Sequence, residues 1–504
     1  MSQFLFHRPS SVWFPETLRP CTLVLDLNQR PVPAKMQWTD DELKLDLLED
    51  QCGRVNAMVA LPDGQNVLLG TPWLFPKWSG YRLEVEILRG VIARIRLVAE
   101  MWEANQLELP SAYPERMRQL THRFIGVWKA KDFATVTEEG RELLQELLQL
   151  SDQVTDGLLM RQGNRPFAEG QADGQKGGKF YLGGRMELPS WDQPVPEVAS
   201  SLETRPSDLE RFCDSPVLNW IGLRRPWKPE PKPSVDEVHK AARTVESMVH
   251  KLKQGRKQVV WGPIFDVGRD RMPDGQPLGD NGENLRQELV NTLQNQLPAL
   301  AGDVGLVHVI SGINGVGVNG LTPTTQSDLV IEALESANTI APYTQLMISF
   351  DQPFCERHAW SVGGQTPEYF LTKLAKQRTP LHAIGLEFNL GYFPRGTLPR
   401  TDLDWILLLQ SWAIWEVPIY IMLRMPAEVD TAGRSKLFAP AYRADGSANG
   451  MRAAVQHLTQ LFSSLPWIHG MMVTGLGDQD ASYPEKWEEE DANGVPANNL
   501  FFRI

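Results

Sequence analysis

Eight short apolar segments recur in the C-terminal two thirds of this 504-residue chain, and most are apolar at nearly every position. Runs of this kind are typical of parallel strands that are buried on both faces. Stretches long enough for a crossover helix separate most of them, such as SVDEVHKAARTVESMVHKL and SDLVIEALESAN. The segments begin at Lys179, Leu218, Gln258, Val304, Gln345, Leu381, Val417 and His469. The pattern predicts an α/β fold, with a (β/α)8 TIM barrel over residues 179–504 and an active face at the carboxyl ends of its strands.

The N-terminal third carries two other patterns. Residues 1–78 contain short runs such as TLVLDL, RVNAMVAL and QNVLLG, punctuated by Pro, Asn and Asp-Gly, which predict a small β-sandwich-like domain. Residues 79–162 contain two long stretches with apolar side chains at helical spacing, so we expect a long helical hairpin. The Gly-rich, polar residues 163–178 indicate a linker into the barrel.

Composition narrows the class of protein. The net charge of −12, without a compensating Lys/Arg block, argues against a nucleic-acid partner. We expect no membrane span and no export signal, because no apolar stretch reaches about 18 residues and no basic-then-apolar pattern follows Met1. The four cysteines form no CxxC pair and fit a reducing compartment, so the expected location is cytoplasmic. We expect no cofactor and no metal site, and the oligomeric state stays open.

A glycine motif offers one alternative. Gly315–Gly320 spells GxGxxG after the apolar run VHVI, but a dinucleotide fingerprint needs its helix to open within the glycines. Here the helix is expected near Pro323 or Ser327, and the next acid at a strand end, Asp351, lies farther on than the roughly 20 residues a ribose contact requires. We interpret the motif as a loop, with nucleotide binding as a weaker alternative.

Carboxylates at the predicted strand ends are the strongest chemical signal. Glycoside hydrolysis needs two carboxyl groups flanking one bond. Glu387, inside IGLEFNLGY, is the most pointed case, because a charge beside a buried strand is costly without a partner or a function. The alternative to a catalytic role is that each strand-end acid forms a structural salt bridge, for example Glu387 with Arg395 or Arg400. The acids at strand ends are Asp266, Asp351, Glu356, Glu387 and Asp478, and the catalytic candidates among them are Glu387, Glu356 and Asp351.

Aromatic, amide and cationic side chains near the same ends suit a sugar, whose rings stack on flat aromatics and whose hydroxyls pair with polar groups. Sixteen tryptophans mildly favour such a surface, although Trp405, Trp412 and Trp415 lie in a helical stretch and belong to the core. The candidate substrate-binding residues are Asp478, Asn314, Trp227, Arg224, Trp261, Asp266, Asn389 and Tyr392.

Several barrel segments resemble a known family. VHVISGIN, LMISFDQPFCE, GLEFNLGYFPRG, VPIYIMLRMP and HGMMVTGLGDQD, in this order, are similar to the divergent xylanase-like proteins of glycoside hydrolase family 10 known from planctomycetes. The resemblance covers residues 179–480. It implies a (β/α)8 barrel and, for the well-characterised members, retaining hydrolysis of β-1,4-xylan by two glutamates, an acid/base ending strand four and a nucleophile ending strand seven.

The chain departs from that family pattern at both catalytic places. Strand four ends in Ser311–Asn314 where the family has Asn-Glu, and strand seven ends in Leu423–Met425 where it has Thr-Glu. The family's His-x-x-Trp-His of strand three is replaced by Trp261–Asp266. Neither glutamate can therefore be carried over. The resemblance to the divergent group implies that acids on strands five and six replace them, and in this chain these acids are Asp351, Glu356 and Glu387.

Two hypotheses follow. In the first, the protein hydrolyses a β-linked polysaccharide or oligosaccharide in the manner of an endo-1,4-β-xylanase, with Glu387 as nucleophile or base and Glu356 as general acid. Asp351 and Asp478 then orient sugar hydroxyls or the partner acid. In the second, the loss of both family glutamates marks a catalytically inactive carbohydrate-binding or scaffold pseudoenzyme.

Overall fold

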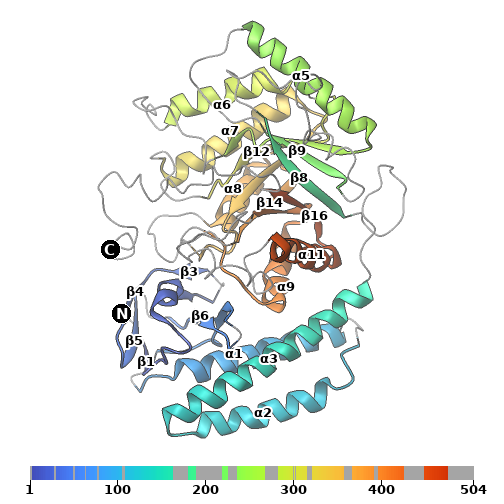
Figure 1. Cartoon of the computed structure of the whole chain (residues 1–504). Helices are drawn as coiled ribbons and strands as arrows, with labels where there is room; N and C mark the ends of the chain where they lie inside the picture. Colours follow the sequence, from blue (N-terminus) through green and yellow to red (C-terminus); the bar gives the residue numbers. More distant parts are fainter. Residues whose placement is uncertain are drawn as a thin grey trace.

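The structure, a computed structural model, combines two small antiparallel sheets, a layer of long helices and a closed parallel barrel (Figure 1). It describes residues 3–27, 30–48, 51–62, 64–76, 79–104, 108–162, 180–188, 218–224, 235–266, 282–298, 300, 302–314, 321–356, 366–390, 396–424 and 448–474.

The N-terminal β region consists of two sheets that enclose one apolar core. The first sheet has the order β1 (Gln3–His7), β5 (Glu42–Leu47), β4 (Ala34–Trp38), and the second has the order β3 (Pro31–Val32), β2 (Leu23–Leu25), β6 (Arg54–Ala60), β7 (Asn66–Gly70). Burial alternates along β5, as expected for a strand with one face on the core. Phe4, Phe6 and Trp13 are completely buried between the two sheets and the helices that follow.

Three long helices form the next layer, where the sequence pattern had predicted two. They are α1 (Leu83–Ala104), α2 (Tyr113–Lys129) and α3 (Phe133–Gln162). The apolar pattern does not indicate α2, because this helix buries only a narrow stripe of Tyr113, Met117, Leu120 and Val127 on a mostly polar surface.

The barrel contains all eight predicted strands and confirms the predicted (β/α)8 fold. Its strands are β8 (Tyr181–Glu187), β9 (Trp220–Arg224), β10 (Gln258–Trp261) with β11 (Phe265–Asp266), β12 (Leu306–Ser311), β13 (Gln345–Asp351), β14 (Ala383–Asn389), β15 (Ile419–Arg424) and β16 (Ile468–Thr474). All pairings in this sheet are parallel, and β10 pairs with both β9 and β12, which closes the ring. Between β10 and β11, a Cβ on Gly262 (φ +115°) would lie 2.1 Å from the His308 carbonyl oxygen, so only glycine fits where strand three passes strand four.

Helices surround the barrel wall. They are α5 (Val235–Gln254), α6 (Glu283–Gln296), α7 (Pro323–Ile340), α8 (Pro367–Gln377), α9 (Asp402–Gln410) with the 3-10 turn η5 (Ser411–Trp415), and α11 (Ala448–Ser464). Threonine caps three of them: the hydroxyls of Thr322, Thr366 and Thr401 each accept a hydrogen bond from a backbone N–H in the first turn. No helix in the described part of the chain is both long enough and apolar enough to cross a bilayer.

The N-terminal layers pack against one side of the barrel. Helices α1 and α3 lie against α9 and α11 (Figure 1). Leu398, just after β14, is buried in a small core together with Leu18 and Leu68 of the β region. The backbone N–H of Leu68 donates to the Pro399 carbonyl at 2.8 Å. The segment that leaves the carboxyl end of β14 is therefore held from outside by the N-terminal region.

Candidate functional site at the barrel mouth

The interior of the barrel is divided into an apolar floor and a polar mouth. The amino-terminal halves of the strands contribute the floor, a cluster that includes Trp220, Met347 and Tyr420. The rings of Trp220 and Tyr420 stack with centroids 4.7 Å apart. Toward the carboxyl ends of the strands the inward side chains become polar, so any chemistry inside the barrel lies at this end.

Glu387 is the centre of the polar mouth. Its Oε1 accepts hydrogen bonds from the Ser311 hydroxyl at 2.8 Å, from the Gly312 backbone N–H at 2.8 Å and from the Ser349 hydroxyl. The donors come from the ends of β12 and β13, and Gly312 has a φ of +66°, a conformation that favours glycine. No described residue donates to Oε2, and the side chain is half-buried. The carboxylate is thus fixed through one oxygen while the other remains unused.

Asp351 lies beside Glu387, because the two residues are register partners on the neighbouring strands β13 and β14. Asn389, two residues beyond Glu387, donates from Nδ2 to Asp351 Oδ1 at 2.8 Å. Asn314 donates from Nδ2 to the Asp351 carbonyl at 2.7 Å, and its own Oδ1 is buried with no hydrogen-bond partner among the described residues. Two carboxylates and two amides therefore meet at the ends of strands four to six.

Further charged residues face the same mouth. Asp266 is the register partner of Ser311, the residue that donates to Glu387. Arg424, at the end of β15, is the register partner of Asn389, and Arg224 ends β9. Asp266, Arg424 and Arg224 are all buried and all take part in further interactions.

Glu356 does not belong to this group of acids, because its side chain is buried against an arginine. It is completely buried and accepts a hydrogen bond from Arg400 at 2.6 Å. Arg400 in turn stacks over the rings of Phe354 and Trp405, which belong to the layer between strands and helices. The alternative considered for the strand-end acids, a structural salt bridge, therefore describes Glu356.

Trp261 also points away from the mouth. It is 2% exposed and donates from its indole nitrogen to Gln296 of α6 at 3.2 Å, on the outer side of the barrel wall. A side chain packed against a helix cannot stack on a sugar inside the barrel. Trp261 is therefore a core residue and not the substrate-binding residue expected from the sequence.

Some of the expected site residues fall outside the described residues, namely Trp227, Tyr392, Asp478 and the loop Gly315–Gly320. The helix after that loop, α7, begins at Pro323 with Thr322 as its cap. It opens beyond the last glycine, as expected for a loop and unlike a dinucleotide fingerprint.

Two serines in this site were not identified from the sequence. Ser311 and Ser349 are 3% and 0% exposed and both donate to Glu387. A signal for them existed, because each is a polar residue inside an otherwise apolar strand segment, where a hydroxyl needs a partner.

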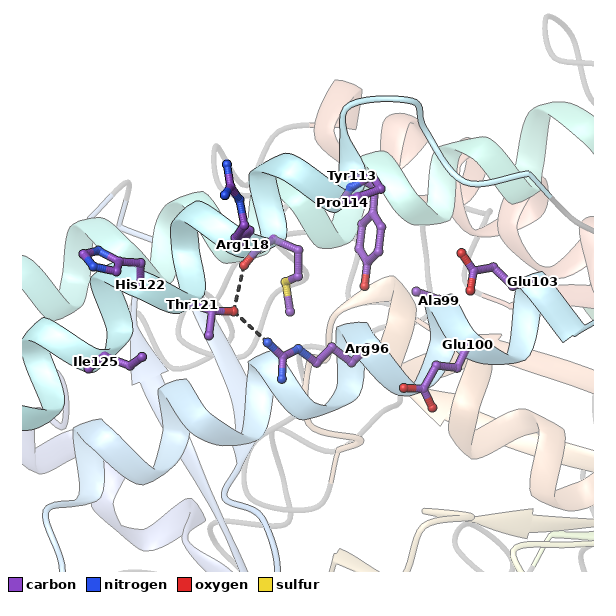
Figure 2. A pocket seen from close by; sticks show the side chains of 11 residues that line it. Arg96, Ala99, Glu100, Glu103, Tyr113, Pro114, Arg118, Thr121, His122 and Ile125 are labelled. Carbon is purple, nitrogen blue, oxygen red and sulfur yellow. Dashed lines mark hydrogen bonds between the residues drawn. The ribbon is translucent and has the colours of Figure 1, made fainter.

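A separate hollow lies on the N-terminal helices, between α1 and α2, with a volume of about 650 Å³. Figure 2 shows Arg96 of α1 donating to the Thr121 hydroxyl of α2 and the Tyr113 ring turned toward α1. Charged side chains from both helices line an open groove remote from the barrel strands. Within the described ranges, no three His, Cys, Asp or Glu residues are placed to hold a metal ion.

The fold and its mouth define a (β/α)8-barrel protein with paired carboxylates at the carboxyl ends of strands five and six. No protein-family model matches the sequence, and no curated protein matches it.

Solved structures with a similar barrel include glycoside hydrolases. One is a glycoside hydrolase family 10 protein from Paenibacillus barcinonensis (16% identity, 61% of this chain and 88% of that chain covered, TM-score 0.40). Another is xylanase 10B from Thermotoga petrophila in complex with xylobiose (12%, 59% and 82%, TM-score 0.36). A third is the catalytic domain of a family 53 protein from Ignisphaera aggregans (12%, 62% and 88%, TM-score 0.39). At these identities and TM-scores the likeness concerns general architecture and carries no conclusion about activity.

Proposed function

We propose that the protein is a glycoside hydrolase that acts on a β-linked glycan at the barrel mouth. The observation that carries the proposal is the register pairing of Asp351 and Glu387 on neighbouring strands, with both side chains half-buried at the carboxyl end of the barrel. Hydrolysis of a glycosidic bond needs two such carboxyl groups on either side of one bond.

The proposed roles follow from how each carboxyl group is held. Glu387 is fixed by three donors on Oε1, which leaves Oε2 for attack on the anomeric carbon, so we assign it as nucleophile. Asp351 takes the acid role first expected of Glu356. Retaining enzymes hold their two carboxyl groups roughly 5–5.5 Å apart, and side chains on neighbouring strands, which lie about 4.8 Å apart, can reach such a separation.

The test is glycan hydrolysis by the purified protein, followed as release of reducing ends from xylan and from β-1,4-galactan. Glu387→Gln keeps an oxygen that can accept the three hydrogen bonds but removes the charge, so we expect turnover to fall by roughly 10³-fold or more. Glu335→Gln, on the exposed face of α7, is the matched control and leaves turnover unchanged. Equal activity in Glu387→Gln and the wild type would sink the assignment.

A second candidate function is a pseudoenzyme that binds a glycan without cleaving it. The observation that favours it is Arg424, 8% exposed, at the end of strand seven where the resembled family places its nucleophile. A buried guanidinium there cannot attack carbon. Calorimetric binding of xylo- or galacto-oligosaccharides, with no reducing ends released over a long incubation, would favour this candidate over the hydrolase.

A further inference from the structure

His308 lies inside the barrel beneath the carboxylate site. It sits on β12, is 3% exposed, and its Nε2 lies 2.8 Å from the Ser349 hydroxyl and 3.1 Å from the Ile310 carbonyl oxygen. A carbonyl oxygen can only accept a hydrogen bond, so Nε2 carries the proton and donates it. The contact with Ile310 therefore fixes the tautomer of the ring.

The tautomer of His308 determines what Ser349 does. His308 Nε2 has one hydrogen, shared between the Ile310 carbonyl and the Ser349 oxygen, so the single hydroxyl hydrogen of Ser349 is left to donate to Glu387 Oε1. Hydrogen bonds in such a chain polarise one another, so the serine is a better donor than an isolated hydroxyl. The chain runs from the barrel interior to the carboxylate.

The surroundings keep the imidazole neutral. Burial lowers the pKa of His308 to about 3; the positive charges of Arg185 and Arg224 act in the same direction, and Asp266 acts against them. At neutral pH the ring therefore has no second proton to give, and it holds its neighbours in place instead of transferring a proton.

We propose that His308 is a positioning residue that orients Ser349 and, through it, the Glu387 carboxylate at the barrel mouth. The proposal rests on the proposed function for the role of Glu387, but the His308–Ser349–Glu387 chain itself can be tested separately. Its value to a reaction is geometric: a nucleophile held to within about 0.5 Å of its reacting position needs supporting groups that are themselves locked.

The first experiment needs no substrate. In protein labelled with ¹⁵N-histidine, His308→Gln identifies the His308 ring signals by their loss. We expect a neutral ring protonated on Nε2 from about pH 5 to about pH 8, and a shifted Nε2–H signal in Ser349→Ala. A ring protonated on Nδ1, a charged ring at neutral pH, or an unmoved signal in Ser349→Ala would each overturn the proposal.

The second experiment measures kcat and KM on the glycan that the wild type cleaves. Ser349→Ala and His308→Leu each remove a link, so we expect kcat to fall about tenfold with KM nearly unchanged. His308→Gln keeps an N–H near the Nε2 position and should restore kcat to within about threefold of the wild type. Unchanged kcat in a folded Ser349→Ala protein, or a loss in His308→Leu that glutamine does not restore, refutes the positioning role.

The two experiments separate the two proposals. If the wild type cleaves no glycan while the expected His308 signals are observed, the proposed hydrolysis fails and the positioning chain stands. If turnover depends on Glu387 but the ring signals contradict the Nε2–H tautomer, hydrolysis stands and the positioning role fails.

Discussion

Glu356 and Arg400 form an ion pair of 2.6 Å in which the side chains are 1% and 5% exposed. Arg400 also donates to the Leu398 carbonyl and stacks over Phe354 and Trp405. The pair links the segment after β13 to the segment after β14, at the place where Leu398 enters the N-terminal core. The pair is therefore part of the framework that joins two segments beyond the carboxyl ends of these strands.

Glu356→Gln is therefore expected to lower the free energy of unfolding by roughly 3 kcal/mol, because it leaves the buried Arg400 charge without its counter-ion. Urea denaturation measures this, with Glu335→Gln on the exposed face of α7 as the control. A change in the free energy of unfolding below about 0.5 kcal/mol would contradict the structural role of Glu356. A loss of kcat in a variant of unchanged stability would instead support a catalytic role.

Asn389→Ala tests the support of the second carboxylate. Asn389 donates to Asp351 Oδ1 at 2.8 Å, and its own backbone N–H donates to the Thr397 hydroxyl at 3.2 Å, a bond that the substitution keeps. Losing this donor loosens the hold on the Asp351 carboxyl group, so we expect kcat to fall about tenfold with a smaller change in KM. Steady-state kinetics on the cleaved glycan decide this, and unaltered kcat would show that Asp351 needs no such support.

A double-mutant cycle tests how the N-terminal helices are joined to the barrel. Arg94 of α1 pairs with Asp404 of α9 at 2.9 Å, with side chains 7% and 13% exposed. Arg94 also donates to the Gly70 carbonyl. We expect Arg94→Met and Asp404→Asn each to destabilise strongly, and the double variant to lose less than the sum by roughly 2 kcal/mol. Additivity within about 0.5 kcal/mol in urea denaturation would mean that the pair contributes no coupling.

The contact of α3 with α9 and α11 is expected to depend on pH. Burial and the nearby Asp402 and Asp156 raise the pKa of Asp152 from 3.8 to about 6. Burial by itself lowers the pKa of His457. The hydrogen bond between His457 and Asp402 outweighs burial and raises this pKa above 6.5. Both groups bind protons more tightly in the folded state, so the stability they contribute is lost as pH rises from about 4 through 6.5 and above.

Asp152→Asn removes the acidic part of this dependence. We expect the variant to be more stable than the wild type near neutral pH and its stability to fall less between about pH 4 and about pH 6. Neighbouring groups desolvate the Asp152 carboxyl, but the residue keeps substantial contact with solvent, so screening keeps the effect small. Urea denaturation across this pH range, with exposed Glu139→Gln as the control, measures it. A steeper pH dependence in the variant would reverse the assignment.

The sequence pattern located the barrel strands well because both of their faces are buried. A strand such as β12, buried at all six positions, must be apolar almost throughout, and that signal is local. The apolar pattern did not reveal α2, because this helix buries only a narrow stripe of side chains and the rest of its surface is polar. Trp261 shows what the pattern cannot predict within a strand: a continuous apolar run does not indicate which side chains face into the barrel and which face the helices.

What the chain determined by itself was the succession of buried strands, the barrel they close, and the presence of acids at their ends. Which acids belong together was decided by the tertiary structure alone. Glu387 lies near the carboxyl end of β14 and Glu356 follows β13, yet Glu387 turns into the mouth to accept from Ser311, whereas Glu356 turns into the wall to meet Arg400. The reason is physical: a buried carboxylate is stabilised by whichever donors surround it, and those donors come from segments distant in sequence.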